Sequence, residues 1–180
     1  DLGGAVPVKE IDGTGLILIP GLIDGHEHIM GGGGEGGFHT RTPEAGLTDL
    51  TMNGVTTVVG CIGTDGVARN MEALLAKAHA LEEEGVTTYV YTGSYQVPVH
   101  TVTGDVIRDI MLLDQVIRAG EIAISDHLAS QPTLEDFVRI TSTHPAVVML
   151  HGQPRILHFP LWVAYRLADI YGDSLAAARI

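Results

Sequence analysis

The sequence has little cysteine and little positive charge, and both shortages limit what the protein can be. A single cysteine, Cys61, excludes an intrachain disulfide framework and favours a reducing compartment, so we expect a cytoplasmic protein. The formal net charge of -12 argues against nucleic acid and against an anionic membrane as partners. No apolar run is long enough to cross a bilayer, and no signal-peptide pattern is present.

Several common site motifs are absent as well. The glycine run Gly31 to Gly34 lacks the dinucleotide-binding fingerprint and the Gly-Lys-Ser/Thr of a nucleotide-binding loop, although its backbone N–H groups could still cradle a phosphate. There is no serine-nucleophile elbow, and no motif surrounds Cys61. The sequence therefore offers no recognisable serine or cysteine nucleophile.

Apolar residues make up 45% of the 180 residues, enough for one sizeable core. The chain begins at Asp1 without a methionine, and we expect it to be incomplete at one or both ends. Turn signals, caps and hydrophobic periodicity predict strands and helices along the chain. The predicted strands are 6–11, 16–19, 22–28, 55–61, 86–92, 121–125 and 146–151. The predicted helices are 43–52, 71–84, 105–119, 133–143 and 160–170.

From residue 22 onward, strands alternate with helices, and the unit recurs about every 30 residues. This order predicts an α/β fold with a parallel sheet and helical crossovers. Five such units fit an open doubly wound sheet and also a closed eight-fold barrel. A complete barrel usually needs more than about 200 residues, so this chain would supply about five of its eight units.

A histidine pair forms the first candidate site. His26 and His28 follow an apolar run and precede the glycine run. Side chains alternate along a strand, so these two imidazoles point the same way and can reach one metal ion. A His-x-His pair alone is weakly specific, and two ordinary hydrogen-bonded histidines at a strand end stay an alternative.

Four further residues lie at the start or just at or after the end of later predicted strands. His151 ends an apolar strand, which places it on the same rim as the first pair if the sheet is parallel; a core histidine is the alternative. Asp126 and His127 follow the fourth strand and are weaker candidates for a ligand or substrate contact. Glu121 opens that strand, where a buried carboxylate would be costly unless it is paired or binds a cation, and a carboxylate can also bridge two metals. On its own, however, Glu121 is read as an ordinary helix-end or loop glutamate after Gly120.

The loops after the first three strands carry polar groups that suit a small polar ligand. Glu35 could hold an ammonium group, while Thr64 offers a hydroxyl and Tyr95 a phenol; each could equally be a turn residue. We assign no role to the remaining histidines, which are His39, His79, His100, His144 and His158.

Together these residues resemble a known family. Pro-Gly-Leu-Ile-Asp-Gly-His-Glu-His at 20–28 resembles the first-strand signature of the amidohydrolase superfamily. The resemblance to bacterial isoaspartyl dipeptidases is closer and rests on several segments between residues 8 and about 127. These segments are 26–35, 40–44, 54–60, 63–65, 74–78, 92–95 and 123–127. Beyond residue 128 the resemblance weakens, although His151-Gly152 still looks like the fifth-strand metal histidine.

The resemblance implies a (β/α)8 TIM-type barrel at 20–180, with residues 1–19 belonging to a small β domain. It implies two zinc ions and a bridging hydroxide that hydrolyses the isopeptide bond of β-aspartyl dipeptides. His26 and His28 would hold the first zinc, and His151 the second. Glu35 would bind the substrate's α-ammonium group, Gly33 and Thr64 would contact the substrate, and Tyr95 would help to polarise the scissile carbonyl. An exposed strand edge makes pairing with another chain plausible, so we expect a homo-oligomer.

The sequence departs from the family pattern in three respects. Many members bridge their metals with a carboxylated lysine, but the lysines here, Lys9 and Lys77, lie elsewhere, so we expect Glu121 to be the bridge. Leu128 stands where the family commonly has a substrate-binding arginine. A sixth-strand histidine and an eighth-strand aspartate would lie beyond Ile180, so we expect these 180 residues alone to be a poor catalyst. Two alternatives stay open: an N-acyl amino acid or cyclic amide hydrolase, and a non-catalytic incomplete barrel that binds metal or serves in an assembly.

Overall fold

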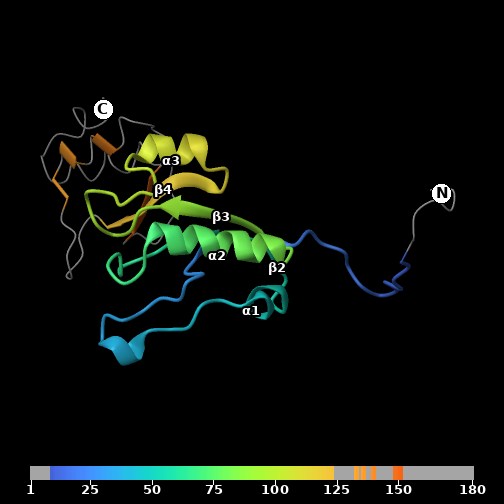
Figure 1. Ribbon diagram of the computed structural model, residues 1–180. Helices are drawn as coiled ribbons and strands as arrows, with labels where there is room; N and C mark the ends of the chain where they lie inside the picture. The colour runs from blue at the N-terminus through green and yellow to red at the C-terminus, as the bar shows by residue number, and fades with distance from the viewer. Residues whose placement is uncertain (1–8, 124–131, 134, 137–138, 141–147, 152–180) are drawn as a thin grey trace, which may run out of the picture.

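The protein is built around a parallel sheet whose strand order follows the chain, β1-β2-β3-β4-β5 (Figure 1). The computed structural model describes residues 9–123, 132–133, 135–136, 139–140 and 148–151. Every neighbouring pair in the sheet is parallel, which confirms the predicted α/β class and is consistent with part of a TIM-type barrel. The strands are β1 (Leu22–Glu27), β2 (Val55–Gly60), β3 (Thr87–Thr92), β4 (Val116–Ala123) and β5 (Val148–His151).

Helices connect the strands. They are the 3-10 turn η1 (Phe38–Thr40), α1 (Leu47–Thr51), α2 (Met71–Glu83) and α3 (Val106–Leu112). In Figure 1, α2 runs alongside β3, and α3 lies next to β4. Because parallel strands need such crossovers, the described loops that follow β1, β2 and β3 lie at one edge of the sheet.

The main core lies between α2 and the sheet. The helix buries Met71, Leu74, Ala78 and Leu81, which recur at helical spacing. They pack in one cluster with strand residues such as Val58 and Val90. Fully burying one such aliphatic side chain contributes about 1.5–3 kcal/mol, so this face fixes where the strand ends lie.

Helix α2 confirms the prediction for residues 71–84, including its cap. The Asn70 side chain accepts a hydrogen bond from the Ala73 amide at 2.9 Å, as an N-cap residue does. Farther along the chain, the Asp136 amide donates to the Thr133 hydroxyl, and the described residues 135–136 and 139–140 are helical. The predicted Thr133 cap is therefore confirmed as well.

The helix predicted at 43–52 is wrong in its first part, because α1 begins only at Leu47. Thr42, the expected cap, uses its hydroxyl elsewhere: it accepts a hydrogen bond from the Gly32 amide at 2.7 Å. This bond ties the segment after η1 to the glycine run.

The helix predicted at 105–119 is also too long, since α3 ends at Leu112 and Val116 already lies in β4. Val116 and Arg118 pair with β3, and the Gln115 carbonyl accepts from the Val90 amide at 2.8 Å. Pairing with β3 outweighed the helical spacing of the apolar residues in this stretch.

The segment before β1 differs from its prediction too. The turn at Asp12 to Gly15 forms, with the Leu16 amide donating to the Gly13 carbonyl at 2.9 Å. The strand predicted at 16–19 does not form; these residues are exposed and the segment extends away from the sheet (Figure 1). Within the described residues no strand lies beside it to complete a ladder. Its assignment to a small β domain stays a prediction.

Some predictions fall on residues outside the described ranges. They concern the first half of strand 6–11, the Asp126-His127 pair, Leu128 and the helix at 160–170; the described residues 9–11 do not form the predicted strand. Among the helices of the described part, none is long and apolar enough to cross a membrane.

Candidate functional site

Two histidines from β1 meet a carboxylate from β4. His26 Nε2 lies 3.1 Å from Glu121 Oε2, and His28 Nε2 lies 3.7 Å from the same oxygen. The two imidazole rings have centroids 5.6 Å apart. The structure thus brings together three of the residues that the sequence marked as candidate metal ligands.

Glu121 is fully buried, whereas the two histidine side chains keep about a third of their surface exposed. A buried carboxylate is unfavourable unless a cation or hydrogen-bond donors face it. The reading of Glu121 as an ordinary loop residue is therefore wrong: it lies inside β4, and its side chain faces both histidines.

The shared carboxylate affects the two histidines differently. The hydrogen bond with Glu121 raises the pKa of His26 above its ordinary value, against the opposing effect of burial. Burial lowers the pKa of His28, and the charge of Glu121 only partly offsets this. The neutral form, which is the one that binds metals, is therefore favoured at His28.

Cys61 joins this group, which the sequence interpretation missed. Its sulfur and one ligand atom each from His26, His28 and Glu121 all lie within 4.8 Å of one another. Burial, followed by the charge of Glu121, strongly raises the pKa of this thiol. A usable signal existed, because Cys61 directly follows β2 and so lies at the same edge of the sheet as the histidines.

The four donors suit a divalent metal ion. Nitrogen, sulfur and oxygen ligands bind zinc at about 2.0–2.3 Å, so two donors on one ion lie at most twice that distance apart. A group spread over 4.8 Å needs little adjustment to meet this limit. His28 Nδ1 is also buried without a hydrogen-bond partner in the described part of the chain. We call His26, His28, Cys61 and Glu121 the donor cluster.

His151, the fourth predicted ligand, is placed by its backbone. It ends β5 and is paired in register with Ala123 of β4. Glu121 lies earlier on that same strand. His151 therefore lies at the sheet edge that carries the donor cluster.

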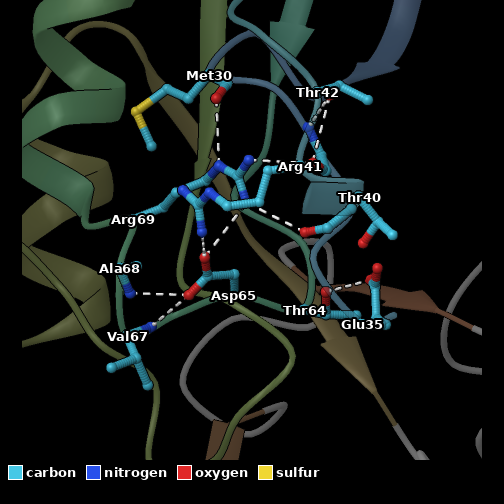
Figure 2. Close-up of polar contacts among 12 residues, drawn as sticks. Met30, Glu35, Thr40, Arg41, Thr42, Thr64, Asp65, Val67, Ala68 and Arg69 are labelled. Atoms are coloured by element: carbon cyan, nitrogen blue, oxygen red, sulfur yellow. Dashed lines mark hydrogen bonds and ion pairs between the residues drawn. The ribbon is translucent and has the colours of Figure 1, made fainter. Parts of the chain in front are cut away.

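The predicted substrate residues Glu35 and Thr64 contact each other directly. The Thr64 hydroxyl donates to Glu35 Oε1 at 2.6 Å, which joins the loop after β1 to the loop after β2 (Figure 2). This bond, together with one from the backbone of Glu35, lowers the pKa of the Glu35 carboxyl. An exposed, ionised carboxylate at this position can attract a cationic group.

Gly33 is fixed by close packing. Its φ of +70° suits glycine, and an added Cβ would collide with the Thr40 carbonyl oxygen. Gly63 is similarly restricted, because a Cβ there would collide with the His28 ring. The glycine run thus packs against the segment at Thr40, and the loop after β2 packs against the donor cluster.

Tyr95, the predicted catalytic residue, is buried and held by its backbone. Its amide donates to the Gly63 carbonyl at 3.1 Å, and its carbonyl accepts from the Ala123 amide at 3.1 Å. The loop after β3 is thereby attached to the loop after β2 and to the end of β4.

A buried carboxylate of α3 supports that loop. Asp109 accepts hydrogen bonds from the hydroxyls of Thr92 and Thr103, each at 2.6 Å. It also accepts from the amides of Val102 and Thr103. These four donors fix the two ends of the segment that contains Tyr95.

Arg69 and Asp65 form a second polar group that the sequence interpretation did not identify (Figure 2). Arg69 is 5% exposed and donates to carbonyl oxygens of the glycine run as well as to Asp65. Asp65 also pairs with Arg41. Burial alone would raise the pKa of Asp65, but hydrogen bonds from the Ala68 amide and from Arg41 outweigh burial and lower it.

Solved structures with this architecture include β-aspartyl dipeptidases from Fervidobacterium islandicum AW-1. One matches 91% of this chain and 48% of its own, with a TM-score of 0.78 and 48% sequence identity. A second, in complex with the β-Asp-Leu dipeptide, matches 68% of this chain and 33% of its own, with a TM-score of 0.66 and 63% identity.

Curated relatives include dihydroorotases. The protein from Endomicrobium trichonymphae is 30% identical over 155 residues, which are 83% of this chain and 34% of the relative. That from Streptococcus pyogenes serotype M3 is 27% identical over 146 residues, 79% of this chain and 32% of the relative. The chain thus spans about a third of the length of these relatives, and no family model matches it. Both kinds of relative are amidohydrolases, and the chain is similar to members of the amidohydrolase superfamily over most of its own length.

Proposed function

We propose that the protein hydrolyses the isopeptide bond of β-aspartyl dipeptides in a metal-dependent reaction. The observation that carries this proposal is the donor cluster, which lies beside the Glu35–Thr64 pair at one edge of the sheet. Identities of 48% and 63% to β-aspartyl dipeptidases support the choice of substrate.

The metal would be held by His26, His28, Glu121 and His151, with Cys61 close enough to be a further donor. We expect two zinc ions, with Glu121 shared between them in place of a carboxylated lysine. When bound, such ions polarise a carbonyl group and lower the pKa of water. Glu121 would also keep His26 and His28 oriented, because both Nε2 atoms face its Oε2.

The substrate would lie against the loops that follow β1, β2 and β3. Glu35, ionised and fixed by Thr64, would bind the α-ammonium group of the β-aspartyl residue. Thr64 and the backbone at Gly33 would line the same pocket. Tyr95 would donate a hydrogen bond to the carbonyl oxygen as negative charge develops on it.

The architecture that goes with this function is a (β/α)8 barrel, of which residues 20–180 supply about five units. Residues 1–19 would belong to a small β domain. The full site would then need residues from the rest of a barrel, so catalysis belongs to a chain that contains them.

We place the protein in the cytoplasm, because a single buried thiol suits a reducing compartment. We also expect a homo-oligomer, since an exposed strand edge favours pairing with another chain.

The test compares substrates on the zinc-loaded protein in a chain that contains the rest of the barrel. We expect hydrolysis of β-Asp-Leu with a kcat/KM well above that for α-Asp-Leu, N-acetyl-leucine, hydantoin and dihydroorotate. If the protein hydrolysed N-acetyl-leucine but not β-Asp-Leu, the result would contradict the proposal and favour an N-acyl amino acid hydrolase.

Cyclic amide hydrolysis is the second candidate, because the curated relatives are dihydroorotases at 27–30% identity. It would be favoured if dihydroorotate or hydantoin were opened faster than β-Asp-Leu is cleaved. The lower identity of these relatives places this function behind the first.

The remaining alternative is a non-catalytic, incomplete barrel that binds metal only weakly or serves as a subunit of an assembly. Metal analysis of the purified protein separates it from the two enzymes. Two tightly held ions per chain would argue against this role, and weak or absent binding would support it.

A further inference from the structure

Arg69 lies buried between the loop after β1 and the loop after β2, and its guanidinium contacts both (Figure 2). Its Nε donates to the Met30 carbonyl at 3.2 Å, and its Nη2 donates to the Gly32 carbonyl at 3.0 Å. Its Nη1 is shared between the Gly33 carbonyl at 3.4 Å and Asp65 Oδ2 at 3.3 Å. One side chain thus binds three carbonyl groups of the segment that leads from His28 to Glu35.

This arrangement explains how a run of glycines can have a fixed shape. Glycine loses more conformational freedom on folding than any other residue, so a four-glycine run does not order itself. A buried guanidinium, in turn, needs nearly all of its donors satisfied. The loop supplies carbonyl acceptors for the buried guanidinium. Arg69 in turn supplies a planar set of donors in a fixed geometry, which orders the loop.

Asp65 fixes the direction of Arg69. Its Oδ1 accepts from the amides of Val67 and Ala68, at 3.2 and 2.8 Å, which anchors the carboxylate to its own turn. Its Oδ2 faces Arg69 and also Arg41. Since Thr64 is the neighbour of Asp65 in sequence, the same turn presents the hydroxyl that binds Glu35.

We propose that Arg69 is a positioning residue for recognition of the substrate's α-ammonium group, acting through the glycine run to hold Glu35 in place. This inference rests on the proposed function and adds a residue to it. Arg69 binds the start of the run at Met30, Gly32 and Gly33, and Thr64 binds its end at Glu35. With both contacts in place the carboxylate has one position relative to the donor cluster; without Arg69 it has many.

The test measures how much the α-amino group of the substrate contributes to kcat/KM. β-Asp-Leu and N-succinyl-leucine differ only in that group, so the ratio of their kcat/KM values is an amine preference. In a chain that contains the rest of the barrel, we compare the zinc-loaded wild type with Arg69→Met, Arg69→Lys, Glu35→Gln and the double variant Arg69→Met/Glu35→Gln. Arg108→Gln, which changes an exposed arginine of α3, is the matched control.

We expect Glu35→Gln and Arg69→Met each to lower the amine preference by about tenfold or more, the scale of one charge-assisted hydrogen bond. Turnover of N-succinyl-leucine should change far less, and the double variant should lose little beyond either single one. Arg69→Lys, which keeps the charge but not the planar fork, should fall between wild type and Arg69→Met. A loss that is equal for both substrates would overturn the inference, because general damage to the fold predicts that result.

A second measurement does not depend on catalysis. Hydrogen exchange of the amides at 31–35 should become faster in Arg69→Met and stay unchanged in Arg108→Gln; unchanged exchange in Arg69→Met would overturn the inference. Should Arg69→Met fail to fold, Arg69→Lys carries both measurements. If the wild type cleaves neither substrate, the proposed function fails, while the exchange experiment still decides whether Arg69 holds the loop.

Discussion

Thr64 donates its hydroxyl hydrogen bond to Glu35 Oε1 over 2.6 Å and so joins the loops that follow β1 and β2. The bond favours the charged form of the carboxylate, which is the form that a substrate ammonium group requires. Thr64 thereby affects both the position of Glu35 and its protonation.

Thr64→Val should raise the pKa of the Glu35 carboxyl toward its ordinary value, because the hydroxyl donor is lost while the size is kept. In the folded protein this pKa is lowered, so the interaction stabilises the fold above the ordinary pKa of glutamate. That contribution is lost as the pH falls through the lowered value. Carboxyl NMR titration of the folded protein measures the shift. Thr64→Ser, which keeps the hydroxyl, should leave the pKa low; an unchanged pKa in Thr64→Val would contradict the assignment.

Glu121→Gln should weaken metal binding strongly. Changes outside the ligand shell already reduce metal affinity by about 10–100-fold, so replacing a carboxylate that faces both histidines should reduce it at least as much. Zinc content after dialysis against a calibrated chelator measures the metal affinity of each variant. Glu83→Gln, at an exposed position of α2, is the control. Full zinc occupancy in Glu121→Gln would show that Glu121 does not bind the metal.

Asp109→Asn should destabilise the fold by about 2–4 kcal/mol, because four donors converge on a buried carboxylate and the amide cannot accept them all. Urea denaturation followed by circular dichroism measures the free energy of unfolding. The exposed Asp114→Asn should change it by a few tenths of a kcal/mol at most. Equal stability of the two variants would mean that the Asp109 hydrogen bonds contribute little net free energy.

Asn70→Ala should cost about 1 kcal/mol of stability, since it removes the side chain that caps α2 at the Ala73 amide. Asn70→Asp keeps the acceptor and adds a negative charge at the helix N-terminus, so it should be at least as stable as the wild type. Thermal unfolding of the three proteins under one buffer condition compares them. A wild-type melting temperature for Asn70→Ala would rule out a stabilising cap at this position.

Local signals predicted much of the fold. Helix α2 was predictable because its cap, its apolar spacing and the glycine after it all agree, from Asn70 to Gly85. The segments at 43–52 and 105–119 were predicted less well, because contacts distant in sequence decide them. Thr42 binds the Gly32 amide and does not cap a helix, and Val116 pairs with β3.

In the candidate site, too, local signals predicted some residues, while contacts distant in sequence decide the others. His26 and His28 could be found from their spacing, because a strand places both side chains on one face. The place of Cys61 at the end of β2 could be found from the sequence, but its closeness to the histidines depends on how β2 lies beside β1. The contacts of Arg69 with Met30 and Gly32 likewise exist only once two loops have folded against each other.

Because the strands lie side by side in chain order, each one can pair with the strand synthesised just before it. During synthesis the strands would therefore leave the ribosome in the order in which they pair. No strand depends on a partner that is made much later. The donor cluster would be completed in the same direction. The histidines emerge first and Cys61 next, and β4 then brings the carboxylate of Glu121 to a nearly assembled site.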